Sequence, residues 1–249
     1  MEVYSQKVLE TNYTYVIPRG DKAIVVDPGE SLPVEKLLAD RGLELHAILL
    51  THKHWDHVNG VSDLVNKYHP LVYGFEGEDF EIEVSAFSEG EVLKILDLEI
   101  QTIHLPGHTM GACAFYIDNC LFTGDVLFGG GCGRVFEGSP LDMLGSLDKL
   151  ALLPDDTLIY FGHEYTKANL SFAKHVEPDN QAILDRYERC GDKTVPSNIG
   201  LEKKTNPFLR VDELSVIEAV DQYMGSESQD RVERFGVLRG WKNAYDSGE

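Results

Sequence analysis

The sequence predicts an α/β domain followed by a helical region. Up to residue 164, short apolar runs typical of strands alternate with helical patterns, which is the arrangement expected of an α/β domain. After that residue the strand patterns stop, and helical patterns remain, separated by prolines. A chain of 249 residues suits one large domain with an appendage. We therefore predict an α/β domain of residues 1–164 and an α-helical domain of residues 165–249.

The first hundred residues are predicted to consist mainly of strands. We expect strands over residues 3–9, 11–17, 23–26 and 47–50, and several short strands between residues 71 and 103. The last two of these short strands should pair about Asp97. Ser31 is the expected N-cap of a helix over residues 33–40 that ends at Gly42. A second helix is expected over residues 58–68.

The rest of the chain is predicted to move from strands to helices. A tight turn at residues 105–109 precedes expected strands over residues 112–117, 120–123 and 158–161. The glycine-rich residues 129–134 are expected to form a flexible loop, but they lack the spacing of a phosphate-binding loop. Ser139 is the expected N-cap of a helix that runs to about Leu152. Three more helices are expected over residues 168–176, 180–189 and 212–223.

The charge and the cysteines limit the classes of partner. The net charge of −20 comes from 42 acidic and 22 basic residues, so the mean field repels nucleic acid and anionic membranes. An anionic small substrate would need a local basic patch. No apolar run has the length of a membrane span, and the N-terminus lacks the pattern of a secretory signal. The four cysteines form no Cys-x-x-Cys pair, so we expect reduced thiols and a cytoplasmic location.

A cluster of potential metal ligands follows the apolar run of residues 47–50. His52 and His54 are two residues apart, so in an extended chain their side chains point the same way and can share one target. Asp56 and His57 come where the chain turns, and they would face an adjacent target. Imidazole and carboxylate groups are ligands for zinc, iron or manganese. The alternative is a polar loop with chance histidines, but four ligand-type side chains in six positions favour a metal site.

Three further candidate ligands, His108, Asp125 and His163, lie near the ends of other predicted strands. Loops at one edge of a sheet can bring such residues together. Seven ligands exceed the needs of one tetrahedral ion, but they suit two ions that share a carboxylate. Our hypothesis places His52, His54 and His108 at one ion, Asp56, His57 and His163 at the other, and Asp125 between them.

The order of the motifs HxHxDH, PGHT, GD and GHE resembles that of the metallo-β-lactamase superfamily. This resemblance implies a four-layer αββα sandwich with the metals at the edge between two sheets. Within the superfamily, the chain is similar over essentially its full length to the glyoxalase II, or hydroxyacylglutathione hydrolase, family. The matching segments are THKHWDH (51–57), LPGHT (105–109), LFTGDVLFGGGCGRVFEGSP (121–140), FGHEYT (161–166), HVEP (175–178), NPFLR (206–210) and LRGWKN (238–243).

The resemblance implies a binuclear-metal hydrolase of S-(2-hydroxyacyl)glutathione thioesters. Its expected main reaction converts S-D-lactoylglutathione to glutathione and D-lactate, a step of methylglyoxal detoxification. The expected cofactors are two divalent ions, zinc first and iron or manganese as alternatives, with Asp56 and Asp125 as catalytic carboxylates. Water bound to such ions ionises near neutral pH. A thiolate leaves without a strong general acid, so no dedicated acid is required.

The family resemblance also implies residues that bind glutathione, which would make residues 165–249 a substrate-binding domain. The corresponding residues here are Arg134, Phe136, Tyr165, Arg239 and Lys242. The cations among them would supply the local basic patch that an anionic tripeptide needs in a chain of charge −20. Phe136 stands where some relatives have tyrosine, so one hydrogen bond to glutathione is expected to be missing.

Other members of the superfamily are the competing interpretations. A glutathione persulfide dioxygenase shares the fold and part of the glycine-rich loop, but it works with one iron and has less need of Asp56, His57 and His163. Lactonases, β-lactamases and phosphodiesterases lack the matching helical tail. A non-enzymatic binding module would be expected to have lost a ligand, and none is lost. We expect a monomer without nucleic-acid or membrane partners.

Overall fold

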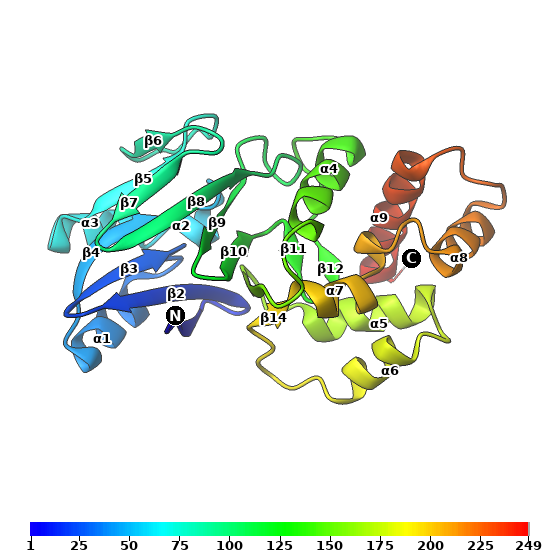
Figure 1. Ribbon diagram of the computed structural model, residues 1–249, viewed down its shortest axis with the longest axis horizontal. Helices are drawn as coiled ribbons and strands as arrows, with labels where there is room; N and C mark the ends of the chain where they lie inside the picture. The colour runs from blue at the N-terminus through cyan, green and yellow to red at the C-terminus, as the bar shows by residue number, and fades with distance from the viewer. Residues whose placement is uncertain (249) are drawn as a thin grey trace.

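Two six-stranded β-sheets pack face to face in the computed structural model, which describes residues 1–248. Helices cover the outer face of each sheet, and a group of further helices lies at one end of the sandwich (Figure 1). The prediction of a four-layer αββα sandwich with a C-terminal helical region is therefore confirmed.

The first sheet is mixed and comes entirely from residues 4–87. Its strands, in spatial order, are β1 (Tyr4–Val8), β2 (Asn12–Arg19), β3 (Lys22–Val26), β4 (Glu44–Leu49), β5 (Leu71–Phe75) and β6 (Ser85–Phe87). Strands β3 to β6 are parallel to one another. The β3–β4 connection runs through helix α1 (Ser31–Arg41) and the β4–β5 connection through helices α2 (Trp55–Val58) and α3 (Val61–Tyr68), whereas residues 76–84 join β5 to β6 without a helix.

The second sheet contains strands from the middle of the chain and one from the helical region. Its strands, in spatial order, are β14 (Ser197–Asn198), β13 (Leu158–Phe161), β10 (Cys120–Gly124), β9 (Cys113–Ile117), β8 (Leu98–His104) and β7 (Val92–Ile95). Strands β7 and β8 form the expected hairpin about Asp97, with Ile95 opposite Leu98. Strands β10 and β13 are parallel, so their carboxyl ends lie at the same edge.

The first sheet is buried on both faces, which explains its continuous apolar strands. In β3, Ile24 and Val26 belong to the core between the sheets, whereas Ala23 and Val25 face the core under α1 and α3. Strand β4 alternates in the same way. Because successive side chains of a strand point to opposite faces, both sets of apolar residues are needed.

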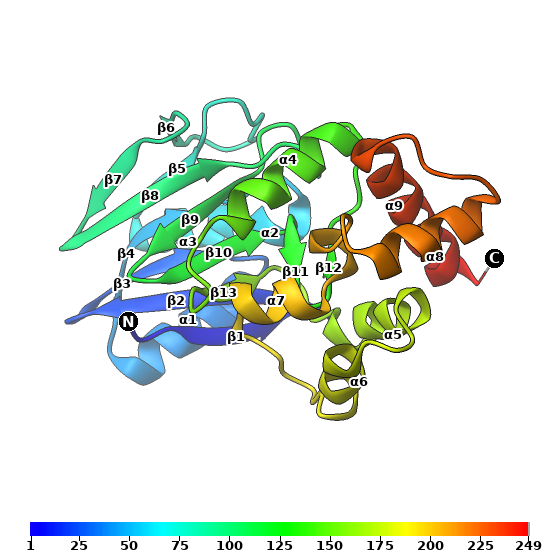
Figure 2. The same cartoon turned by 45° about the vertical axis from the view of Figure 1, so that its right-hand side comes forward.

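The remaining helices pack around the second sheet and at its end. Helix α4 (Pro140–Ala151) begins with the predicted N-cap, since Ser139 and Asp142 form a capping box. The helical region contains α5 (Thr166–Val176), α6 (Gln181–Glu188), α7 (Ile199–Thr205), a 3₁₀ turn (Pro207–Leu209), α8 (Leu214–Met224) and α9 (Arg231–Ser247). In a second view, helices α5, α6, α8 and α9 stand together at the end of the molecule away from β3, β4 and β7 (Figure 2). No helix among residues 1–248 combines the length and the apolar character needed to cross a membrane.

The sequence-based predictions are wrong at four places. Strands do not stop at residue 164, because β14 pairs antiparallel with β13. The glycine-rich segment is not a flexible loop, because residues 129–133 are buried, Arg134 alone is exposed, and most of the segment lies in or beside a two-stranded ribbon of β11 (Leu127–Phe128) and β12 (Gly131–Cys132). The helix over residues 58–68 is broken near Gly60, where a Cβ would lie 2.6 Å from the carbonyl oxygen of Pro28. Ser31 lies inside α1 and donates its hydroxyl hydrogen to Asp63 instead of capping the helix.

Candidate metal centre

The candidate ligands lie where four segments meet at the edge of the two sheets. His52 and His54 follow β4, and Asp56 and His57 lie in the short helix α2. His108 lies in the turn after β8, whereas Asp125 and His163 come one and two residues after the ends of β10 and β13. The structure thus brings together all seven residues, from positions up to 111 residues apart in the sequence, that the sequence analysis singled out.

Glycines let these segments approach one another closely. A Cβ at Gly162, next to His163, would lie 2.2 Å from Oδ1 of Asp125. Gly124, next to Asp125, has φ of +49°, and a Cβ there would lie 2.3 Å from Oγ1 of Thr51. A side chain at either position would displace a candidate ligand or its support.

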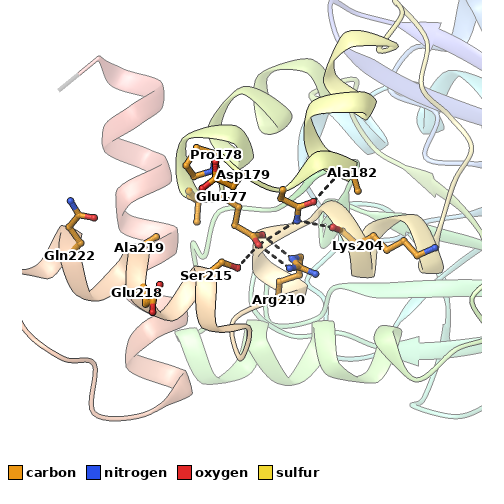
Figure 3. A pocket seen from close by; sticks show the side chains of 12 residues that line it. Glu177, Pro178, Asp179, Ala182, Lys204, Arg210, Ser215, Glu218, Ala219 and Gln222 are labelled. Carbon is orange, nitrogen blue, oxygen red and sulfur yellow. Dashed lines mark hydrogen bonds and ion pairs between the residues drawn. The ribbon is translucent and has the colours of Figure 1, made fainter.

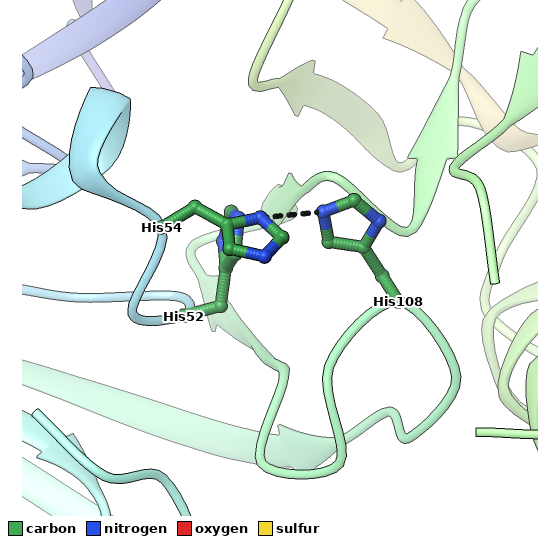
Figure 4. Close-up of side chains that lie close together, drawn as sticks. All are labelled: His52, His54 and His108. Carbon is green, nitrogen blue, oxygen red and sulfur yellow. Dashed lines mark hydrogen bonds between the residues drawn. The ribbon is translucent and has the colours of Figure 1, made fainter. Parts of the chain in front are cut away.

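One group of ligand atoms consists of ring nitrogens from His52, His54 and His108. Nδ1 of His54 lies 3.1 Å from Nε2 of His52 and 3.0 Å from Nε2 of His108. Figure 4 shows the rings of His54 and His108 facing each other across this short distance, with His52 beside them. The three ligand atoms lie within 4.8 Å of one another, which is a spacing suited to a single ion.

A second group consists of Asp56, His57 and His163. Nε2 of His163 lies 3.3 Å from Oδ2 of Asp56 and 3.4 Å from Nε2 of His57. Asp125 lies between the two groups, because its Oδ2 is 3.1 Å from Nε2 of His163 and 3.5 Å from Nε2 of His108. The geometry matches the grouping that the sequence suggested, with one carboxylate adjacent to both groups.

Outer hydrogen bonds fix the orientation of the histidine rings. Nδ1 of His108 lies 2.8 Å from the carbonyl oxygen of Arg134, and Nδ1 of His57 lies 3.0 Å from Oδ2 of Asp27. Each acceptor requires the hydrogen to be on Nδ1, so in the neutral ring Nε2 carries a lone pair that points into the centre. These rings are therefore oriented as ligands.

His52 is oriented through a chain of two hydrogen bonds. Thr51 donates its hydroxyl hydrogen to Asp27 over 2.6 Å, so its oxygen is left to accept from Nδ1 of His52 at 3.0 Å. Asp27 also accepts from the backbone N–H of Thr51. Asp27, His52 and His57 form a third group of ligand-type atoms, but the oxygens of Asp27 are already occupied by these donors. We interpret Asp27 as a support for the histidines.

The electrostatics of the centre favour a bound positive charge. Burial lowers the pKa of His52 and of His108, which favours the neutral rings that bind metals. Burial alone would raise the pKa of Asp125, but His57 and His163 outweigh it and hold that pKa well below its usual range. Burial lowers the pKa of His57, but Asp125 and Asp27 raise it well above the ordinary value. Ionised carboxylates at this depth require compensating positive charge, either as protons or as metal cations.

An unsatisfied atom at the centre also fits a cation. Oδ1 of Asp125 is buried and accepts no hydrogen bond of good geometry from the described residues, although Nε2 of His57, itself a candidate ligand atom, lies 3.3 Å away. Buried carboxylate oxygens normally have a partner. Convergent lone pairs from oriented histidines and a free carboxylate oxygen are the donor set of a divalent metal centre.

Several supporting residues were missed by the sequence analysis. Asn12 donates to Oδ2 of Asp56 over 2.8 Å, and Oγ1 of Thr11 lies 3.0 Å from Nδ1 of His163. Asp27 could have been found, since it directly follows a predicted strand, as Asp125 does. Asn12 and Thr11 left no such signal, because they belong to the start of a strand whose partners are distant in sequence.

A cavity of about 510 Å³ opens beside Asp125 and His108. It is lined by all five of the predicted glutathione-binding residues, Arg134, Phe136, Tyr165, Arg239 and Lys242. The ring of Tyr165 stacks on that of His163, with centroids 4.7 Å apart, and the ring of Phe136 packs against His54 and His108. The cavity therefore connects the candidate metal centre to the helical region.

Two of the three cations that line this cavity are held inside the protein, whereas Arg134 is exposed. Arg239 and Lys242 lie on α9 and are only 6% and 3% exposed, respectively. Arg239 donates to the carbonyl oxygen of Cys132, while its Nε has no partner among the described residues. Burial lowers the pKa of Lys242, against the opposing effect of its ion pair with Asp246. Buried cations with spare donors suit an anionic ligand.

A larger cavity, of about 630 Å³, lies among α5, α6, α7 and α8 and contains none of the candidate ligands (Figure 3). Its centre is an ion pair in which Arg210 donates two hydrogen bonds of 2.9 Å to Glu177. Ser215 donates to the same carboxylate. This network of Glu177, Arg210 and Ser215 joins the helices, and its polar groups are bonded to one another.

The fold and the centre are those of the metallo-β-lactamase superfamily. The family model described as "Metallo-beta-lactamase superfamily" matches residues 7–163, and the model described as "Hydroxyacylglutathione hydrolase C-terminus" matches residues 164–245. The chain belongs to the hydroxyacylglutathione hydrolase family within that superfamily. Membership of the superfamily and the cluster of histidines and aspartates together support divalent metal ions at this centre.

Relatives match the chain almost from end to end. It is 39% identical to the hydroxyacylglutathione hydrolase of Nitrosomonas eutropha over 253 residues, which cover 98% of this chain and 99% of that protein. It is 43% identical to the enzyme of the same name from Cupriavidus metallidurans, over 95% of this chain and 96% of the relative. The predicted family resemblance is therefore confirmed.

Solved structures agree on the fold. ETHE1 from Myxococcus xanthus aligns with a TM-score of 0.70 and 24% identity, covering 97% of this chain and 91% of that one. TTHA1623, solved in a di-iron-bound form, aligns with a TM-score of 0.60 and 27% identity over 84% of this chain and its own full length. The likeness to ETHE1 concerns the fold alone.

Proposed function

We propose that the protein hydrolyses S-(2-hydroxyacyl)glutathione thioesters, chiefly S-D-lactoylglutathione, to glutathione and D-lactate. The observation that carries the proposal is the position of Asp125, which borders both groups of ligand atoms and also lines the cavity with the buried cations. A thioester held by those cations would have its carbonyl beside the metal centre. The names of the relatives support the same activity.

We propose two divalent ions, most simply zinc, as the cofactors. His52, His54 and His108 would hold one ion, Asp56, His57 and His163 the other, and Asp125 would contact both. When bound, such ions supply a water of lowered pKa and polarise the thioester carbonyl. The orphaned Oδ1 of Asp125 and the oriented lone pairs of the histidines support this assignment. Iron or manganese would suit the same ligands.

In this proposal, residues of the chain hold negative charge at the centre and bind the glutathione part of the substrate. Asp56 and Asp125 hold negative charge at the centre, and their fixed oxygens determine where the attacked carbonyl can lie. Arg134, Tyr165, Arg239 and Lys242 bind the glutathione part, which they can do because the cavity places them on one side of the centre. The thiolate leaves without an acid, since thiols ionise near pH 8.5.

We extend the proposal to the organisation of the chain. Residues 1–164 are the catalytic domain and residues 165–249 the substrate-binding domain, an assignment supported by the place of Arg239 and Lys242 on α9. All four cysteines are unpaired, which suits a reducing, cytoplasmic location. The monomeric state and the absence of nucleic-acid partners stay predictions.

A comparison of two reactions tests the function. The purified chain, stripped of metal and reloaded with zinc, is assayed for hydrolysis of S-D-lactoylglutathione, and the iron-loaded chain for oxygen uptake with glutathione persulfide. We expect thioester hydrolysis that a chelator abolishes and zinc restores. Oxygen uptake without thioester cleavage would instead assign the chain to the persulfide dioxygenases. Hydrolysis that persists in the metal-stripped protein would exclude the proposed role of the metals.

A further inference from the structure

We propose that Glu78 is a positioning residue for the His52–His54–His108 group. It acts through hydrogen bonds to the backbone of the two loops that carry these histidines. The inference rests on the proposed metal centre. Glu78 lies in the turn after β5, away from the motifs that carry the chemistry, yet its side chain is only 7% exposed. A carboxylate at that depth requires an explanation, because it loses most of its hydration.

The carboxylate of Glu78 joins the two segments that supply this group of histidines. Its Oε1 accepts from the backbone N–H of Lys53, between His52 and His54, over 3.0 Å. Its Oε2 accepts from the backbone N–H of Gly111, three residues after His108, over 2.8 Å. One buried side chain thus joins the two loops through a pair of charge-assisted hydrogen bonds.

The sequence leaves space for this contact. A Cβ at Gly111 would lie 2.3 Å from Oε2 of Glu78 and 2.7 Å from its Cα, closer than side chains can pack. The backbone of Gly111 does not have a positive φ, so the close approach of Glu78 accounts for this glycine without any need for an unusual backbone conformation.

Only a group with two acceptors can make this bridge. Both partners are backbone N–H donors, and a carboxylate offers each of them an oxygen. A glutamine of the same shape keeps one acceptor but turns an NH₂ group toward the other donor. The substitution therefore removes one hydrogen bond and places two donors face to face, while the volume of the side chain stays the same.

Glu137 also contacts these loops but has a different role. It pairs with the ammonium group of Lys53 at 2.8 Å and accepts from the backbone N–H of Met110. Both side chains of that ion pair are about one-third exposed, and Glu137 belongs to the same segment as Phe136, at the cavity. Glu78 is buried and lies outside the cavity lining, so its effect should be confined to the metal centre.

The experiment compares Glu78→Gln with Glu76→Gln in the full chain. Glu76 lies two residues away, is exposed and makes no side-chain hydrogen bond, so its variant has the same charge change without the bridge. Metal-stripped protein is titrated with Zn²⁺ against a competing chelator. We expect E78Q to bind one of two ions about tenfold more weakly or worse, the effect typical of outer supports of metal ligands. E76Q should bind both ions as the unmodified protein does.

A second measurement needs no metal. Hydrogen exchange of the Lys53 and Gly111 amides in the stripped protein should be faster in E78Q than in E76Q. In the zinc-loaded protein, kcat should fall in E78Q while KM stays the same, because the cations of the cavity are unaffected. Unchanged zinc affinity together with unchanged exchange would overturn the proposal. If the unmodified protein binds no zinc, the proposed function fails, but the exchange data still decide the role of Glu78.

A variant at Gly111, which donates to Glu78, keeps the proposal testable if E78Q does not fold. Gly111→Ala keeps the carboxylate but displaces it, so it should weaken the same ion. If E78Q does not fold, wild-type zinc affinity in G111A would count against the bridge. Glu78→Asp keeps both acceptors with a shorter reach and should recover part of the lost affinity.

Discussion

Oδ2 of Asp27 lies 3.0 Å from Nδ1 of His57, and the same carboxylate accepts from the hydroxyl and the backbone N–H of Thr51. One buried side chain therefore orients two histidines that belong to different groups of candidate ligands, His57 directly and His52 through Thr51. The two halves of the centre are coupled by this support as well as by Asp125.

Replacing Asp27 with asparagine should weaken metal binding at both groups. The amide cannot accept from all three donors, so the histidines lose their fixed orientation, and we expect affinity to fall about 10- to 100-fold. Chelator competition measures the loss. Asp21→Asn, at an exposed turn, is the control and should leave the affinity unchanged. Equal affinities in the two variants would contradict the role given to Asp27.

Asp125→Ala should abolish turnover and lower the zinc content of the protein. Among residues 1–248, Asp125 is the one carboxylate that borders both groups of candidate ligands, so without it neither proposed ion keeps its full set of ligands. Metal analysis after dialysis and an assay with S-D-lactoylglutathione measure the two effects. A variant that keeps two tightly bound ions would show that Asp125 does not bridge them.

Lys242→Ala should mainly raise KM. The ammonium group lines the cavity but is absent from both groups of ligand atoms, so it contributes to binding without a role in the chemical step. We expect KM to rise about tenfold for a lost charge-assisted hydrogen bond, with little change in kcat. Lys36→Ala, on the exposed side of α1, is the matched control. A comparable loss of kcat in K242A would place Lys242 in the chemistry instead.

The same lysine predicts how KM depends on pH. Burial lowers the pKa of Lys242, so it loses its proton at a lower pH than an exposed lysine does. Binding of an anion is strongest below that pKa and weakens as the pH rises through it. KM should therefore rise on the alkaline side, and Lys242→Arg should remove this rise, because a guanidinium group stays charged. An identical alkaline rise in K242R would assign the titration to another group.

Glu177→Ala should destabilise the helical region without changing the chemical step. The substitution leaves Arg210 without its carboxylate inside the network of Figure 3. Loss of one partner of such a buried pair costs about 3 kcal/mol of the free energy of unfolding. Urea denaturation measures the change, and Glu218→Ala, at an exposed position of the same cavity, serves as the control. Equal stability of both variants would show that the pair contributes nothing.

The sequence predicted those parts of the molecule that depend on local patterns. The strands around the core, the capped helix α4 and the edge where His52, Asp125 and His163 meet all follow from apolar runs and the polar residues after them. The family was recognisable because its motifs are long and occur in a fixed order. The roles of the individual ligands stay predictions until metal is measured.

The failures come from contacts between distant segments. Strand β14 has two residues, too few to show a periodic pattern, and it exists only because β13 offers an edge. Helix α9 was not predicted, because after Phe235 and Leu238 its buried positions are occupied by the cations Arg239 and Lys242, which end the apolar pattern. Residues 129–134 were expected to be flexible because of their glycines, but those glycines allow close packing against Thr166 and Asn169.

The pairing of β14 with β13 has a consequence for how this chain could be divided or recombined. The two family models meet at residues 163 and 164, but strands β13 and β14 of one sheet lie on opposite sides of that junction. A fragment cut there would expose the backbone edge of β13 and invite aggregation. If the helical region after residue 163 were replaced by that of a relative, the protein should fold only if the new segment also supplies a strand that pairs with β13 as β14 does. The two modules that the family models distinguish therefore share one sheet.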